Sequence, residues 1–139
     1  MIGSMKEEMA QELLRIYPDS TIYDEDIPQG FETPCFLITV VGQEYYKGIR
    51  KNTSEISFDL AYFSDKPATD IKNDCLAVQQ ELFRGFDLLS KYRCYSKSAE
   101  ITDNVLHFLF KIKYSEIKVA DEKEVPMTNL ELSSVTMKE

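Results

Sequence analysis

Residues 22–38 read IYDEDIPQGFETPCFLI, and this stretch is the most informative in the chain. Its acidic run is followed by Pro28, Gly30 and Pro34, and then by a hydrophobic segment. The two prolines fix φ and remove two backbone donors, while Gly30 permits positive φ. We therefore predict an ordered, non-helical connection that joins two strands.

Alternating side chains predict a long hairpin directly after this connection. The first strand, 34–46, is apolar on both faces, which indicates that both faces are covered. The second strand, 50–63, alternates apolar and polar residues, as expected for an antiparallel strand with one face toward solvent. Gly42 is expected to mark a β-bulge, and Lys47-Gly48 the turn.

Two segments with helical spacing flank this hairpin. The first helix is predicted over 5–17, where Ser4 and Glu7 match a capping box. The second is predicted over 70–90 from its apolar stripe. A second hairpin, 92–101 and 105–117, turns at 102–104, and 21–23 is a short strand candidate.

This order of elements predicts an α+β fold. The expected architecture is a mainly antiparallel, four- to five-stranded sheet with two helices packed on one face. Residues 1–118 form a single domain in this prediction. Residues 119–139 are polar, short of aromatics and interrupted by Pro126, which predicts a flexible C-terminal tail or arm.

Composition narrows the classes of function. The formal net charge of −8 disfavours a protein that grips nucleic acid through phosphates, which needs clustered Lys and Arg. An acidic surface is still compatible with a passage through which DNA slides, and the plainer alternative is solubility. Cys35, Cys75 and Cys94 are widely spaced, which predicts reduced thiols and no structural zinc. We expect no signal peptide and no membrane span.

No set of residues predicts catalysis, a cofactor or a metal. His107 is the single histidine, and no nucleophile or orienting carboxylate is evident for it in the sequence, so we expect a structural or surface role. Asp24, Glu25 and Asp26 offer oxygen ligands for a metal, but their spacing matches no EF-hand. We favour an exposed acidic loop. No P-loop, HExxH or nucleophile elbow is present.

Several segments instead predict contacts between protein subunits. Leu37, Val41 and Leu109, with Ala61 and Phe63, are expected to form an apolar patch on the second face of the sheet, and such patches usually mark interfaces. We also expect contacts at the acidic loop, at the first hairpin tip and at the C-terminal tail. The residues assigned to the loop and the tip are Asp24, Glu25, Asp26, Pro28, Phe31, Tyr45, Tyr46, Lys47, Arg50 and Lys51.

Three blocks of the chain resemble a known family. IYDEDIPQGFETPCFLI, ISFDLAYFSD and ITDNVLHFLFKIKYSEIK, separated by the long helix, are similar to small tail-terminator-like proteins of phages and prophages in Gram-positive bacteria. The resemblance covers residues 5–118 and includes no catalytic residues. YDEDIPQGF and ITDNVLHF are its most specific parts.

The resemblance implies a structural role without enzymatic activity. It implies a ring, commonly a hexamer, that caps the tail tube and joins it to the neck, with tube and neck or sheath proteins as partners. DNA at most passes through the lumen without specific binding. Assembly is expected in the bacterial host cytoplasm, before incorporation into the virion or a tail-like particle. The alternatives are a head–tail connector and, from a different class, a small ligand-binding domain or enzyme with a carboxylate site.

Overall fold

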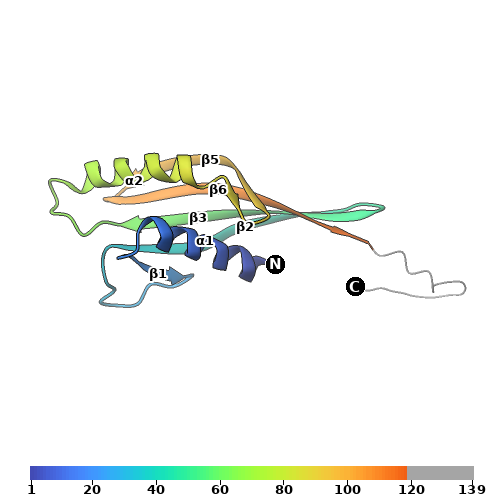
Figure 1. The fold of residues 1–139 in the computed structure, drawn as a ribbon, viewed down its shortest axis with the longest axis horizontal. Helices are drawn as coiled ribbons and strands as arrows, with labels where there is room; N and C mark the ends of the chain where they lie inside the picture. Colours follow the sequence, from blue (N-terminus) through green and yellow to red (C-terminus); the bar gives the residue numbers. More distant parts are fainter. Residues whose placement is uncertain (119–139) are drawn as a thin grey trace, which may run out of the picture.

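The computed structural model describes residues 1–118, which form two helices and six strands (Figure 1). The tail predicted at 119–139 lies outside the described residues. The helices are α1 (Ile2–Ile16) and α2 (Ile71–Gly85). The strands are β1 (Thr21–Asp24), β2 (Cys35–Lys47), β3 (Lys51–Phe63), β4 (Leu88–Leu89), β5 (Tyr92–Thr102) and β6 (Val105–Ile117).

All six strands belong to one sheet, in the order β1-β2-β3-β6-β5-β4. The predicted α+β class is correct and most strand pairs are antiparallel, but the sheet is mixed and has six strands rather than the predicted four to five. β4 was not expected, and β1 pairs with β2 in parallel, from Thr21 opposite Cys35 to Asp24 opposite Ile38. Parallel neighbours usually need a helical crossover, whereas here the connection 25–34 returns the chain without a helix.

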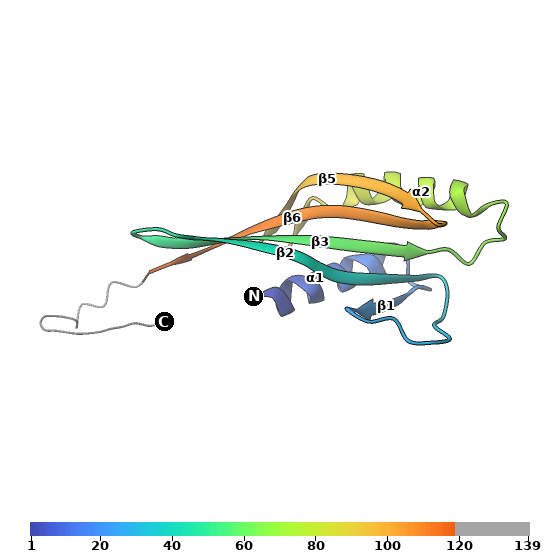
Figure 2. The same cartoon turned by 180° about the vertical axis from the view of Figure 1, so that it is seen from behind.

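The core lies on one face of the sheet. Alternate residues of the three central strands are fully buried there, among them Phe36, Phe58 and Phe108. The Phe58 ring stacks on that of Phe110 at 5.5 Å between centroids. The helices contribute a buried stripe to the same core, comprising Met5, Met9, Leu13, Cys75, Val78 and Leu82. Both helices lie behind the sheet in Figure 2.

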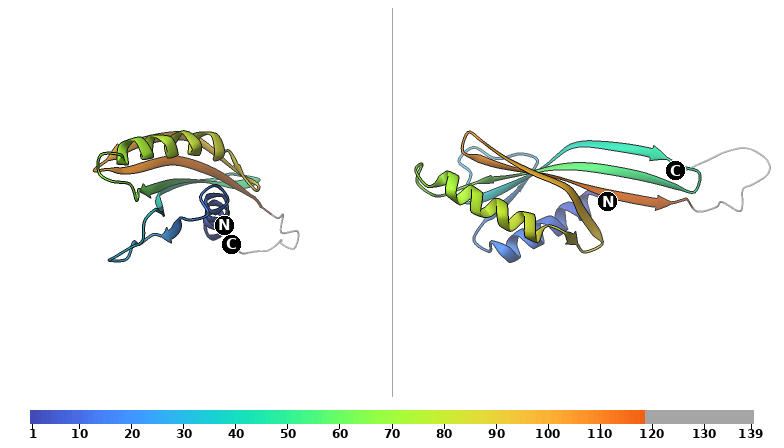
Figure 3. Two further views of the ribbon diagram at one scale, coloured as in Figure 1. Left: turned by 60° about the vertical axis from the view of Figure 1, so that its left-hand side comes forward. Right: turned by 90° about the horizontal axis from the view of Figure 1, so that it is seen from above.

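The helices do not form a simple flat layer, because the sheet is curled (Figure 3). α2 packs over β5 and β6. α1 contacts Tyr92 of β5 through Ser4 near its start, and Phe36 of β2 through Tyr17 just after its end. The hydroxyl of Tyr17 also donates a hydrogen bond to Glu81 of α2. The expected packing of two helices on one face is therefore matched only in part.

Both helix boundaries differ from the prediction. The capping box is wrong, because α1 starts at Ile2 and the Ser4 hydroxyl donates to the Met1 carbonyl oxygen at 3.1 Å. α2 ends at Gly85 rather than at residue 90. A Cβ at Gly85 would lie 3.3 Å from Ile16 Cδ1, so the end of α2 passes close to the end of α1.

The turns and bulges follow the predicted signals. Asp103 and Asn104 adopt φ of 52° and 63°, as a two-residue type I′ hairpin requires. The expected bulge is confirmed, because the register of β2 against β3 shifts between Val40 and Gly42. At the first hairpin tip, a Cβ on Gly48 would lie 2.5 Å from the Lys51 carbonyl oxygen, so this close turn requires glycine.

Thiol reactivity provides one test of the core. The three cysteines are free and buried, and burial raises the pKa of Cys35 to about 11 and that of Cys94 to about 12. Because thiolates are the reactive form, the native protein should react very slowly with a thiol reagent at pH 8 and should react at all three cysteines in denaturant. Rapid reaction of the native protein would contradict this packing.

Substitution of neighbouring residues on β6 tests the two faces of the sheet. Phe108→Ala removes a fully buried ring and should lower the free energy of unfolding by about 3–5 kcal/mol. Leu109→Ala, on the opposite face, should lower it by only about 1 kcal/mol. Urea denaturation measures both. Equal losses would mean that the two faces are buried to the same extent.

Candidate assembly surfaces

The acidic run at the end of β1 is held by its own chain. Lys6 of α1 places its Nζ 2.7 Å from both Asp24 Oδ1 and Glu25 Oε2. Glu25 also accepts a hydrogen bond from the Val40 backbone N–H at 3.0 Å, and its own N–H donates to the Ile38 carbonyl oxygen at 2.8 Å. Glu25 therefore ends the pairing of β1 with β2 and ties both strands to α1.

These contacts change the ionisation of the groups involved. The hydrogen bond from Lys6, and secondly that from the Val40 N–H, hold the pKa of Glu25 below its usual value. Partial burial of Lys6 acts in the opposite direction, but its bonds to the two carboxylates raise its pKa overall. Asp26 remains exposed. Within residues 1–118, no group of three His, Cys, Asp or Glu side chains is placed to hold a metal ion.

The rest of the connection is ordered by two contacts. The Glu32 N–H donates to the Tyr23 hydroxyl oxygen at 3.1 Å. The Phe31 ring packs edge-on against Phe63 of β3, with 5.1 Å between centroids. Pro28 is exposed beyond these anchors. Among the predicted interface residues of the loop, Asp24, Glu25 and Phe31 thus contact other parts of the fold, whereas Asp26 and Pro28 are exposed.

The first hairpin tip projects away from the helices together with the end of β6. We call this three-stranded extension the arm, and it comprises Gln43–Lys47 of β2, Lys51–Glu55 of β3 and Lys113–Ile117 of β6. In the right-hand view of Figure 3 it extends beyond both helices. Every residue from 43 to 51 is exposed, so the predicted contact residues of the tip are all accessible.

The arm carries exposed apolar side chains, two of which, Ile49 and Ile117, were not predicted from the sequence. Ile49 at the turn is 93% exposed and Ile117 is 80% exposed, alongside Tyr45 and Tyr46 at more than half. Ile117 lies opposite Lys51, so the register places it beside the turn that contains Ile49. The available signal was the isoleucine within the Gly48–Lys51 turn, a position where polar residues are usual.

The face of the sheet opposite the helices carries the apolar patch that was expected there. Val41 is exposed, Leu37, Phe63 and Leu109 are half-buried, and Ala61 is buried. No helix among residues 1–118 covers this face, which is turned toward the viewer in Figure 2. A shallow cavity of about 280 Å³ lies between Val41 and Leu109, beside the two strand irregularities of β2 and β5.

His107 lies on this uncovered face and has a partner that the sequence did not reveal. Its Nδ1 is 3.0 Å from Asp59 Oδ2 on the neighbouring strand. The carboxylate can orient the imidazole, as in catalytic triads, but the cross-strand neighbours of His107 are Ala61 and Glu100, neither of which is a nucleophile. The position of Asp59 on the polar side of β3 was the only available signal.

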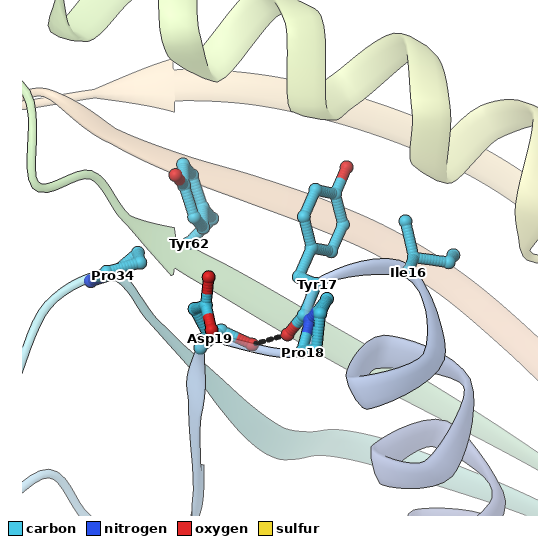
Figure 4. A pocket seen from close by; sticks show the side chains of 7 residues that line it. Ile16, Tyr17, Pro18, Asp19, Pro34 and Tyr62 are labelled. Carbon is cyan, nitrogen blue, oxygen red and sulfur yellow. Dashed lines mark hydrogen bonds between the residues drawn. The ribbon is translucent and has the colours of Figure 1, made fainter.

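A second cavity, of about 210 Å³, lies beside the end of α1 (Figure 4). Its lining consists of Ile16, Pro18, Asp19, Ser20, Pro34 and the rings of Tyr17 and Tyr62. The two tyrosine hydroxyls are engaged outside the cavity, with Glu81 and Asp74. Burial and then these hydrogen bonds raise the pKa of both tyrosines well above the usual value. The cavity therefore presents mainly apolar surface, together with the Asp19 carboxyl and the Ser20 hydroxyl, which donates to the Tyr17 carbonyl oxygen at 2.8 Å.

The helices formed by residues 1–118 include none long and apolar enough to cross a membrane.

The Lys6 contacts can be tested by titration. Lys6→Met removes the main cause of the low pKa of Glu25, so this pKa should rise toward its usual value. Because the pKa is lowered in the folded state, the contact stabilises the fold above the unfolded-state pKa of Glu25, and this stabilisation is lost as the pH falls through the folded-state pKa. NMR titration of the Glu25 carboxyl measures the shift.

Lys72→Met, at an exposed lysine of α2, is the control and should leave the titration of Glu25 unchanged. An unchanged Glu25 pKa in Lys6→Met would contradict the contact.

Comparison with known proteins identifies the family of the chain. Residues 4–124 match the family described as phage tail terminator protein. No curated protein matches the chain. The family match includes α1 from Ser4 onward, the connection 25–34, α2 and the whole sheet, so it extends over most of the sequence. The chain therefore belongs to the phage tail terminator protein family, whose members are structural proteins of phage tails.

Proposed function

We propose that this protein forms a ring, a hexamer by analogy with the family, that caps the tail tube and joins it to the neck. The observation that carries the proposal is the family match over residues 4–124. The function of such a ring is mechanical: it ends the polymerisation of the tube and provides a surface for the next component. It requires complementary protein surfaces and no catalytic residues.

The structure supports this proposal with two separate accessible surfaces. One is the uncovered face of the sheet with its apolar residues, and the other is the arm with Ile49 and Ile117. Contacts between two different surfaces of identical copies are heterologous, and they close into a ring when the rotation between copies is a whole fraction of a turn. Exposed apolar surface of this kind favours assembly over an isolated monomer.

The charge of the chain is compatible with DNA in the lumen. With a net charge of −8, and with exposed carboxylates such as Asp26, the ring would repel the DNA backbone and let DNA pass without specific binding. In a tail-like particle without a head, no DNA passes and the charge serves solubility. Tail tube, neck and sheath proteins are the proposed partners, and the bacterial host cytoplasm is the proposed site of assembly before incorporation into the particle.

Co-expression with the tail tube protein of the same gene module tests the proposal. Tubes should be capped at one end by a ring of this protein and should stop growing, as measured by electron microscopy of tube lengths and by native mass of the isolated ring. A ring that binds head components but never tube ends would favour the head–tail connector instead.

His107→Ala is the control for the enzymatic alternative. Capping should persist, because a mechanical role needs no proton transfer by the imidazole. Complete loss of function in a variant that still folds would revive the catalytic alternative built on His107 and Asp59.

A further inference from the structure

We propose that neighbouring copies in the ring join edge to edge through the arm. In this contact the outer edge of β2, Gln43–Lys47, pairs with the outer edge of β6, Lys113–Ile117, of the next copy. The inference rests on the proposed ring and identifies the surface that builds it. The occupant of each edge is thus a second copy of this chain.

Both edges of the arm lack a neighbouring strand within residues 1–118. On one side, β1 pairs with β2 only as far as Ile38, and Glu25 occupies the Val40 N–H. On the other side, β5 pairs with β6 only as far as Ile112. Open strand edges present backbone donors and acceptors that readily accept another strand. The arm therefore has two open edges of similar length.

The ladder also shows which backbone groups point outward. Hydrogen-bonded and non-hydrogen-bonded pairs alternate along antiparallel strands. Gly48 N–H donates to the Lys51 oxygen, and Lys118 N–H donates to the Arg50 oxygen. When this alternation is followed from these two bonds along each strand, the N–H and C=O groups of three residues on each edge point outward. They belong to Gln43, Tyr45 and Lys47 on β2, and to Lys113, Ser115 and Ile117 on β6.

The charges on the two edges are compatible with a contact between unlike edges. The β2 edge carries Glu44 and Lys47, and the β6 edge carries Lys113 and Glu116, so each edge has one residue of either sign at the same spacing. Parallel pairing that sets Glu44 opposite Lys113 also sets Lys47 opposite Glu116. In this register a β2-to-β6 contact brings opposite charges together at both positions.

The direction of the strands is compatible with a ring. β2 and β6 are each antiparallel to β3, so they run in the same direction. Rotation about an axis along the arm preserves this direction, and β2 of one copy then meets β6 of the next in parallel. The contact leaves one free edge at each end of a chain of copies until the ring closes.

Proline substitution at outward-facing positions tests the contact. Tyr45→Pro and Ser115→Pro each remove an N–H that points out of the arm, so the internal ladder keeps its hydrogen bonds. Each variant alone should lose the ring, measured by native mass of the free protein and by imaging of tube ends. An equimolar mixture should form dimers, because one intact β2 edge still meets one intact β6 edge.

Tyr45→Ala and Ser115→Ala are the matched controls, since they truncate the same side chains and keep the N–H. Both should retain the ring. If proline unfolds the arm, as judged by circular dichroism, Glu44→Lys and Lys113→Glu replace it. Each of these charge variants alone should weaken the ring, and the double variant should restore it.

Three results separate the possible failures. Intact rings in both folded proline variants would overturn the arm contact and leave the capping role in place. Loss of the ring on truncation after Lys118, with intact rings in the proline variants, would assign the interface to residues 119–139 and overturn the inference. A wild-type protein that forms no ring and caps no tube would overturn the proposed function itself.

Discussion

The structure depends on the shared register of three long strands. The pairing of β2, β3 and β6 places buried side chains of one strand opposite buried side chains of the next, so all three strands direct their buried residues to the same face. Burying a phenylalanine stabilises a fold by roughly 2–3 kcal/mol, and several such rings line the helix side of this sheet. The position of the helices, the uncovered face and the extent of the arm all follow from this register.

The same register explains why one sheet has two very different regions. Near the helices, every second side chain of these strands packs into the core, and the other side chains lie on the face that no helix covers. Beyond the helices the strands continue to pair, yet no core lies under them, and both faces and both edges are accessible. On β3, buried Ser54 and Ile56 still alternate with half-buried neighbours, but the strand partners of Ser54 are Tyr45 and Tyr114, which remain partly open to water.

Local patterns predicted most of the fold. Hairpin strands, the bulge at Gly42 and the Asp103-Asn104 turn depend on side chains close in sequence, so they were recognisable. β4 and the parallel pairing of β1 were not, because a two-residue strand has no period and the partner of β1 is chosen by tertiary contacts. The start of α1 was misplaced since Ser4 bonds to Tyr92, a residue far along the chain.

The sequence predicted where the candidate surfaces lie, but it did not predict all of the residues that form them. Exposure of the tip residues followed from their polarity and the turn, whereas Ile49 and Ile117 became notable only when pairing placed the end of β6 beside the tip. The acidic run illustrates the same limit. Its sequence suggested an open patch, but Lys6, from the first helix, was already bound to Asp24 and Glu25. Long-range partners of this kind leave no local signature.

Glu25 has a further consequence for the geometry of the edge beside it. Its side chain occupies the Val40 amide, and its backbone, at φ of 66°, turns the chain away from the sheet. An incoming strand thus meets a fixed stop at Val40 and finds free backbone groups only on the tip side. The Glu25 carboxylate therefore limits where an added strand can begin to pair with β2. It restricts the register slippage that open strand edges otherwise allow.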